Sequence, residues 1–245
     1  MKMKSLITTL TLTIAIASQS IQAGSVIIVA NGASTGPIIT TSLGTDLALG
    51  TRLRVGSFAN TSTLNSVIAN FLNGSSDYAA TTSLLNSNFT DLGTGANYGS
   101  TAQTSSLITV DSTKFLLNAQ ATLTINGSSQ TRNVANGQIT PVTYSAASGI
   151  GNNGSLYLWT AFNNEIGIYR ASTWNTPASD LSNLTINLSA ITAANASTTV
   201  LLGSYVDNAT GNDYLALAPM PEPSTGMLMM IGAFGLVAMR RMRKA

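Results

Sequence analysis

The chain has 245 residues, of which only 8% are charged, and it contains neither cysteine nor histidine. This composition excludes a thiol nucleophile, a Ser-His-Asp arrangement and a zinc site of the usual kind, while carboxylate chemistry, oxygen-ligand metals and Ser/Lys catalysis stay open. The formal charge of +2 comes from the two ends, because residues 24–218 carry five basic against eight acidic side chains, a net charge of −3, with no basic excess for binding nucleic acid.

The N-terminus is typical of a secretory signal peptide. Lys2 and Lys4 precede a short apolar run, Leu6 to Ala17, and a small residue, Ala23, follows a polar segment. We expect residues 1–23 to be removed by signal peptidase after Ala23, once the secretion translocon has exported the chain. An N-terminal anchor helix is the alternative.

Residues 24–218 are long enough for one domain with a sizeable core. Short β-branched or alternating runs separated by turn residues predict a mainly β fold, a single antiparallel β-sandwich or jelly-roll-like domain. The expected strands are Ser25–Ala30, Arg52–Phe58, Thr104–Val110, Ala121–Ile125, Ser155–Phe162, Glu165–Tyr169, Leu184–Leu188, Thr199–Val206 and Tyr214–Leu217.

Several turns and one or two short helices complete the predicted body. The dipeptides Asn126-Gly127 and Asn136-Gly137 favour tight turns, and Asn163-Asn164 separates two strands. Apolar side chains at helical spacing predict a helix from about Thr63 to Leu72, with Ser62 or Thr63 as its cap and Gly74 as its end, and a second helix is expected over Asp77–Leu85.

Chemical motifs in the body are weak. The run Gly149–Gly154 has the letters G-x-G-x-x-G, but a strand rather than a helix is expected after it, which argues against a dinucleotide site. The loop Asp207–Asp213 has carboxylates at both ends that could hold calcium, although a hairpin turn is favoured because the EF-hand spacing is absent. We predict no metal and no cofactor.

Aromatic side chains suggest one binding surface. By strand parity Tyr157, Trp159 and Tyr169 are expected on one sheet face, where they would stack on a sugar or pack in the core. Packing in the core is favoured, and stacking on a glycan is the alternative.

The C-terminus has three parts in a fixed order. A linker, Ala218-Pro219-Met220, leads into Pro221, Glu222 and Pro223; next comes an apolar stretch, Gly226 to Met239. As a helix its 14 residues would measure about 21 Å, less than the bilayer core of about 30 Å, so the expected C-terminal hydrophobic helix would be a transient stop rather than a permanent span. A basic cluster would hold it at the cytoplasmic face: Arg240, Arg241, Arg243 and Lys244.

Signal peptide, Pro-Glu-Pro, short apolar segment and terminal arginines together resemble the PEP-CTERM sorting-domain proteins of Gram-negative bacteria. The resemblance covers Pro221 to about Lys244. It implies that an exosortase, a membrane transpeptidase analogous to sortases, recognises Pro221, Glu222 and Pro223 and cuts at or just after them. It also implies that residues 219–245 form a sorting segment, which anchors the chain transiently in the inner membrane. A simple C-terminal membrane anchor is the alternative.

We therefore expect an exported, non-enzymatic structural protein of the cell surface, envelope or biofilm matrix, with exopolysaccharide as a possible partner and no nucleic acid. Two alternatives stay open. The first is a secreted carbohydrate-binding module that uses the aromatic face. The second is a polysaccharide-active enzyme, which would need two carboxyl groups within about 5 to 9.5 Å of each other.

Overall fold

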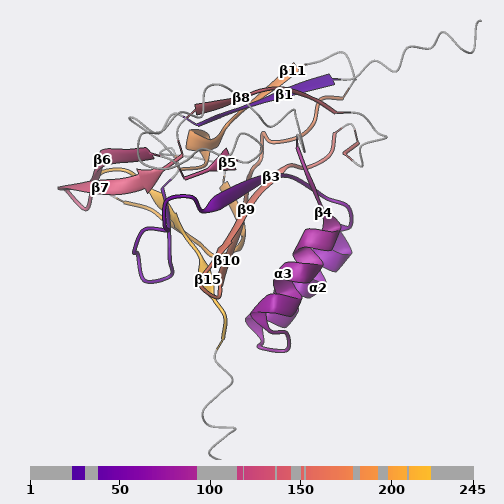
Figure 1. The fold of residues 1–245 in the computed structure, drawn as a ribbon, viewed down its shortest axis with the longest axis horizontal. Helices are drawn as coiled ribbons and strands as arrows, with labels where there is room; N and C mark the ends of the chain where they lie inside the picture. Colours follow the sequence, from indigo (N-terminus) through magenta and orange to yellow (C-terminus); the bar gives the residue numbers. More distant parts are fainter. Residues whose placement is uncertain are drawn as a thin grey trace, which may run out of the picture.

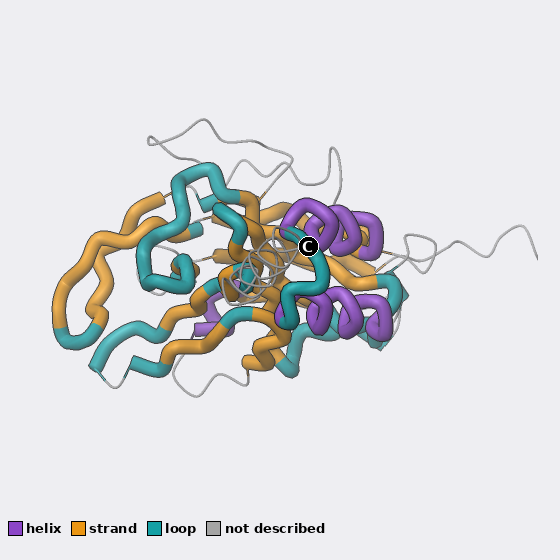
Figure 2. The backbone as a smooth tube through the Cα atoms, turned by 90° about the horizontal axis from the view of Figure 1, so that it is seen from below, coloured by secondary structure: helices purple, strands orange, loops and turns teal. Residues whose placement is uncertain are grey.

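A computed structural model describes residues 24–30, 38–92, 115–117, 119–135, 137–144, 150–151, 153–178, 183–192, 198–208 and 210–221. Strands dominate this part of the chain, together with two α-helices that lie side by side (Figures 1 and 2). The mainly β prediction is confirmed, as are the two short helices.

The elements, in chain order, are β1 (Gly24–Ala30), β2 (Ile39–Thr40), β3 (Arg52–Phe58), α2 (Thr61–Leu72), α3 (Tyr78–Asn88), β4 (Phe89–Asp91), β5 (Phe115–Leu116), β6 (Ala119–Ile125), β7 (Ser128–Val134), β8 (Gly137–Tyr144), β9 (Tyr157–Phe162), β10 (Glu165–Ala171), β11 (Asn183–Asn187), the 3-10 helix η3 (Leu188–Thr192), β12 (Thr198–Leu202), β13 (Ser204–Val206), β14 (Tyr214–Ala216) and β15 (Ala218–Pro219).

The strands form four sheets. The central sheet has the order β12-β10-β9-β3-β4, with β15 also paired to β10 and β5 to β3. A second sheet has the order β11-β1-β8, a third β13-β14-β2, and β6 and β7 form a hairpin. Most pairs are antiparallel, but β1 with β11 and β14 with β2 are parallel. The expected single antiparallel sandwich or jelly roll is therefore not confirmed.

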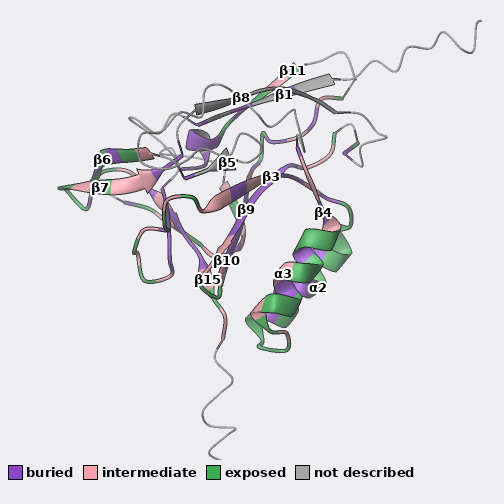
Figure 3. Cartoon of the chain, in the orientation of Figure 1, coloured by how far each residue is buried: buried purple, intermediate pink, exposed green. Residues whose placement is uncertain are grey.

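The central sheet buries both of its faces. Val55 and Leu158 point into the sheet-side core, which also contains side chains of β1, β11 and β14. Trp159 and Ile168 point into the helix-side core, which α2 and α3 cover. Figure 3 shows the outer faces of the two helices exposed and their inner faces buried. The helix-side core consists of Phe58, Leu64, Val67, Ile68, Phe71, Leu85, Phe89, Tyr157, Trp159, Ile166, Ile168 and Leu202.

Helix α2 begins two residues earlier than expected. Asn60, not Ser62 or Thr63, is the N-cap, because its side chain accepts hydrogen bonds from the backbone N–H groups of Ser62 at 2.9 Å and Thr63 at 3.1 Å. The apolar spacing that predicted the helix is the face that it buries.

The end of α2 is as predicted. Gly74 has a φ of +70°, and its N–H donates to the carbonyl of Phe71 at 3.1 Å. The N–H of Ser75 donates to the carbonyl of Asn70 at 2.8 Å, which completes a Schellman motif. Helix α3 then starts after Asp77, whose carboxylate accepts from the N–H of Ala80.

Two predicted turns are confirmed. Asn126 and Gly127 join β6 to β7 with φ values of 51° and 71°, and Asn163 and Asn164 join β9 to β10 with 47° and 63°. Positive φ at both turn residues matches the twist of a two-residue hairpin. Asn136 lies outside the described residues, and the strand that starts at Gly137, β8, pairs with β1.

Most predicted strands are present with ends shifted by one or two residues. The run Thr199–Val206 is instead two strands, β12 and β13, because Gly203 between them adopts a φ of +106°. The predicted strand Thr104–Val110 lies outside the described residues, and a strand, β9, does follow the Gly149–Gly154 run as expected.

The side chain of Tyr169 connects β10 with β14. Its hydroxyl donates to the carbonyl of Ala216 at 2.7 Å, although the side chain is fully buried. A Cβ on Gly167 would lie 2.4 Å from this hydroxyl and a Cβ on Gly203 would lie 2.5 Å from it. Both positions therefore need glycine to make room for the ring. Burial, with a smaller contribution from the charge of Glu165, raises the pKa of Tyr169 well above that of an exposed tyrosine.

The raised pKa of Tyr169 predicts a loss of stability at alkaline pH. Above about pH 10 the unfolded chain releases the phenolic proton while the folded chain keeps it, so the free energy of unfolding falls as pH rises. Urea unfolding between about pH 8 and 11 should show this fall in the wild type and a shallower one in Tyr169→Phe. Equal slopes in the two proteins would contradict the assignment.

Candidate functional site

The body and the C-terminal segment meet at β15. Ala218 pairs with Ile166 and Pro219 with Glu165, so the chain runs antiparallel along the start of β10. Proline is accepted here because β15 has only this one neighbour in the described part of the chain, and an edge position needs no N–H from it. The expected linker Ala218-Pro219-Met220 is thus part of the folded body.

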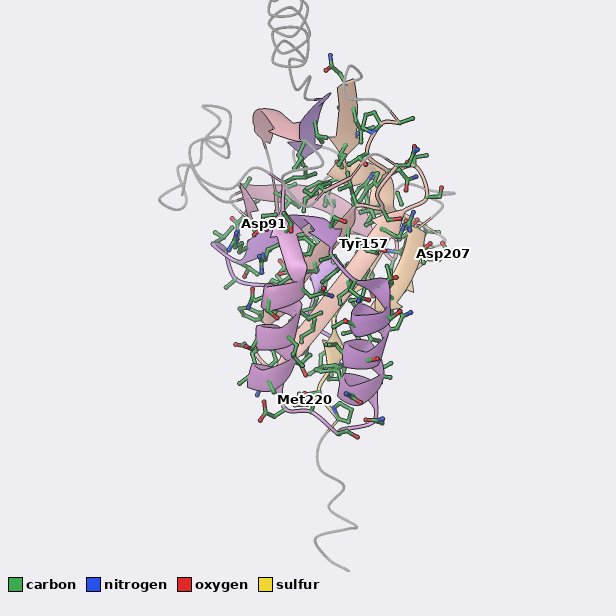
Figure 4. All side chains as sticks on the ribbon, turned by 90° about the vertical axis from the view of Figure 1, so that its right-hand side faces the viewer. Asp91, Tyr157, Asp207 and Met220 are labelled. Atoms are coloured by element: carbon green, nitrogen blue, oxygen red, sulfur yellow. The ribbon has the colours of Figure 1, made fainter. Side chains whose placement is uncertain are left out.

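The next two residues are also held. The N–H of Met220 donates to the carbonyl of Asn164 at 3.0 Å, and its half-buried side chain packs on the helix-side core. The Cβ of Pro221 lies 3.8 Å from the position that a Cβ on Gly74 would occupy. Figure 4 shows Met220 between the lower ends of the two helices. The first residue of the predicted Pro-Glu-Pro motif therefore lies directly against the body.

A neighbouring loop is fixed to the same end of β10. The carboxylate of Glu165 accepts hydrogen bonds from the N–H and from the hydroxyl of Ser42, both at 2.6 Å. Arg132 donates to the carbonyl of Gly44 at 3.0 Å. Between these contacts Leu43 projects into solvent, 88% exposed. Sequence reasoning missed this loop, because nothing in its composition indicates the partner Glu165.

Of the predicted sorting residues, Pro221 is described and lies at the junction. In the residues that the structure describes, no helix is long and apolar enough to cross a membrane. The other predicted positions lie outside the described residues: Ala23, Glu222, Pro223, Gly226–Met239, Arg240, Arg241, Arg243 and Lys244.

The burial of the three aromatic side chains confirms the favoured prediction, packing in the core, whereas the predicted common face is wrong. Tyr157, Trp159 and Tyr169 are 4%, 3% and 0% exposed, so they belong to the core. They also do not share a face: the two-residue turn pairs Trp159 with Ile168 and Leu158 with Tyr169. This register pairs odd-numbered residues of β9 with even-numbered residues of β10, so odd-numbered residues on the two strands point to opposite faces. Tyr157 and Trp159 therefore point to the helix side and Tyr169 to the sheet side.

A buried ion pair covers Trp159. Arg54 donates through Nε to Asp91 at 3.0 Å and also through Nη2, and its guanidinium lies 4.8 Å from the centroid of the Trp159 ring and 5.0 Å from that of Phe89. The side chains of Arg54 and Asp91 are 11% and 7% exposed. Such a paired, stacked guanidinium stabilises the helix-side core. The alternation Arg52-Leu53-Arg54 in the sequence indicates that one face of the strand is polar, but it does not indicate that Asp91 is the partner of Arg54.

The loop between β13 and β14 is built as a turn. Asp213, 6% exposed, accepts from the hydroxyl of Tyr205 and from the N–H of Asn208 at 2.8 Å. Burial and the bond to Asp213 raise the pKa of Tyr205. Among the residues that the structure describes, no group of three or more acidic side chains, His or Cys is placed to hold a metal ion. Of the two carboxylates considered for calcium, that of Asp213 thus holds the turn through its hydrogen bonds with Tyr205 and Asn208.

One comparison with known proteins gives a match. Residues 221–244 match the PEP-CTERM protein-sorting motif, which confirms the resemblance seen in the sequence. No curated protein and no solved structure matches the chain. The motif implies an exported protein, transiently anchored in the membrane, that an exosortase-type enzyme processes and sorts toward the cell surface.

Removal of one partner of the Arg54–Asp91 pair should destabilise the body. Arg54→Met removes two hydrogen bonds to a buried carboxylate and should lower the free energy of unfolding by about 3 kcal/mol. The control is Arg52→Met, because Arg52 contacts the same carboxylate at 3.2 Å but its side chain is 38% exposed; it should cost under about 1 kcal/mol. Chemical denaturation measures both, and equal costs would contradict the described geometry.

Truncation tests where the body ends. A chain of residues 24–220 keeps β15 and Met220 and should unfold at the same urea concentration as residues 24–221. A chain of residues 24–217 loses the pairing with Ile166 and the packing of Met220, and should be less stable by about 2 kcal/mol. If the shorter chain were equally stable, β15 would not belong to the body.

Proposed function

We propose that this protein is a non-enzymatic structural component of the cell surface or extracellular matrix that an exosortase delivers. The observation that carries the proposal is the position of the sorting motif: it begins at Pro221, directly after β15 and Met220, which are held by the body. A processing enzyme that acts within or after Pro221-Glu222-Pro223 would thus remove the apolar and basic segment and leave every described element of the body intact.

The route of export is inferred from both ends. The first described strand, β1, begins at Gly24, the residue after the predicted signal-peptidase cut at Ala23. The proposed partners are the secretion translocon, signal peptidase, the inner membrane and the exosortase, met in that order. The simple membrane anchor is less favoured, because the apolar stretch is shorter than a bilayer core.

The use of the body's carboxylates supports a structural role. Asp46 pairs with Arg132, Asp91 with Arg54 and Glu165 with Ser42. Asp77 caps α3, and Asp213 closes the loop that precedes β14. Each of these groups accepts hydrogen bonds that hold two elements together or that cap one. Acid or base catalysis by any of these five carboxylates would require some of these contacts to be given up.

The surface chemistry suits a matrix. Few side chains are charged, and Ser, Thr and Asn are abundant, so hydroxyl and amide groups make up most of the polar surface. Such groups exchange hydrogen bonds readily with the hydroxyls of a polysaccharide. Because Tyr157, Trp159 and Tyr169 are buried, the proposal does not include a module that stacks sugars on them. No cofactor is part of it.

Alanine replacement of Pro221, Glu222 and Pro223 tests the sorting step. The unprocessed chain should accumulate in the membrane fraction of the native host, because the motif that the enzyme recognises is gone. The matched control replaces three exposed residues of α2, Asn65, Ser66 and Asn70, and should be processed as the wild type is. Intact mass in each fraction is the measurement; unchanged release of the motif variant would refute the sorting step.

Fractionation tests the destination. If the protein is a matrix component, most of the processed body should sediment with the extracellular polysaccharide and be released by enzymatic digestion of that polysaccharide. A body found only as free monomer in the medium would contradict the matrix role and leave the sorting step untouched.

A further inference from the structure

The body presents exposed apolar side chains at the end where its chain enters the sorting segment. Leu43 is 88% exposed and Leu72 is 54% exposed, and Leu84 on α3 is the other large apolar side chain of comparable exposure in the described residues. Leu72 ends α2, two residues before Gly74, which lies beside Pro221. Two of these three side chains thus lie near the junction.

Leu43 reaches the junction through Glu165. Glu165 binds the residue next to Leu43, Ser42, and pairs with Pro219 of β15. In Figure 1 β15, the loop between β2 and β3, and the turn that joins α2 to α3 all lie on the lower side of the body, opposite β1, β8 and β11. We call the surface formed by Leu43, Leu72, Met220 and Pro221 the junction face.

The loop that carries Leu43 is fixed in place. The N–H of Thr41 donates to the carbonyl of Thr45 at 2.7 Å, and the N–H of Gly44 donates to the carbonyl of Thr41 at 2.9 Å. With the contacts of Ser42 and of the Gly44 carbonyl, these hydrogen bonds hold the loop on both sides of the exposed leucine. Because these hydrogen bonds already fix the backbone of the loop, little backbone conformational entropy is lost when an apolar environment covers the leucine.

The sequence sets how far this face can lie from the membrane. Pro221 and Gly226, where the apolar stretch begins, are five residues apart, so even a fully extended chain would separate them by at most about 18 Å. This short tether keeps the body of the unprocessed chain close to the bilayer, and the face nearest to the bilayer is the junction face.

We propose that, before processing, the junction face rests on the lipid interface, with Leu43 and Leu72 inserted among the headgroups. This inference depends on the proposed membrane role of the sorting segment. It gives the body a defined orientation at the membrane surface, so that the Pro-Glu-Pro motif is presented at a fixed depth to a membrane enzyme. Removal of the tail leaves only the two leucines to hold the body, and it is then released.

Site-specific labels test the contact. The chain has no cysteine, so Leu43→Cys, Leu72→Cys and Thr185→Cys each supply one thiol for an environment-sensitive fluorophore. Thr185 is exposed on β11, at the opposite end of the body. Chains with the sorting segment intact are reconstituted into phosphatidylcholine vesicles. The labels at positions 43 and 72 should shift to shorter emission wavelength and be quenched by lipid-borne nitroxides, and the label at position 185 should do neither.

A second set of variants excludes insertion driven by the dye. A label at Asn73→Cys, next to Leu72, should show the emission shift and the quenching when both leucines are present. Adding Leu43→Asp and Leu72→Asp to this labelled chain should reduce the quenching and abolish the emission shift, while the chain still floats with the vesicles. Both leucines are exposed, so the circular dichroism spectrum should not change.

Each contrary result has a distinct meaning. Chains that float but keep solvent-like emission at positions 43 and 72 overturn the lipid contact and leave the sorting function standing. An emission shift that appears only at high protein density indicates a second copy as the occupant and also overturns it. Chains that do not float overturn both the membrane role of the tail and this inference.

Discussion

The register of the β9–β10 hairpin determines how both cores of the body are assembled. Asn163 and Asn164 form a two-residue turn with φ values of 47° and 63°, a conformation that asparagine tolerates better than most residues. The turn pairs Trp159 with Ile168, which sends these side chains to the helix side and Tyr169 to the sheet side. The carbonyl of Asn164 then accepts the N–H of Met220, so the same turn also holds the end of the body.

The described contacts of the body precede the sorting motif in the chain. In the described residues, every member of the sheet-side core, of the helix-side core and of the Arg54–Asp91 pair lies at or before Met220. With no disulfide to support it, the body depends on these apolar cores and a few buried polar contacts. A processing enzyme that cuts within or beyond the motif therefore leaves these cores and this ion pair in the body, which is consistent with a delivered structural protein.

Local patterns in the sequence were sufficient for much of the fold. Alternating β-branched runs located strands such as β3 and β10, and the apolar spacing from Leu64 to Phe71 located α2. Strand β7 was missed because Ser128–Val134 is mostly polar and is recognised only by its pairing with β6.

The odd-even alternation along the chain did not predict the face of Tyr169, because the face to which a residue points depends on the register across the turn. The contacts Glu165–Ser42 and Arg54–Asp91 join residues 123 and 37 positions apart, which no local pattern reveals. The sorting motif was readable because it is a contiguous signal that an enzyme must recognise as such.

Intact-mass measurement of the protein recovered from the native culture, in cells and in medium separately, shows whether the folded body is delivered without its C-terminal segment. We predict that the exported form begins at Gly24 and ends within or just after Pro221-Glu222-Pro223, with any further mass assignable to a group added there or to glycosylation. An exported form that still carries Arg240, Arg241, Arg243 and Lys244 would contradict it.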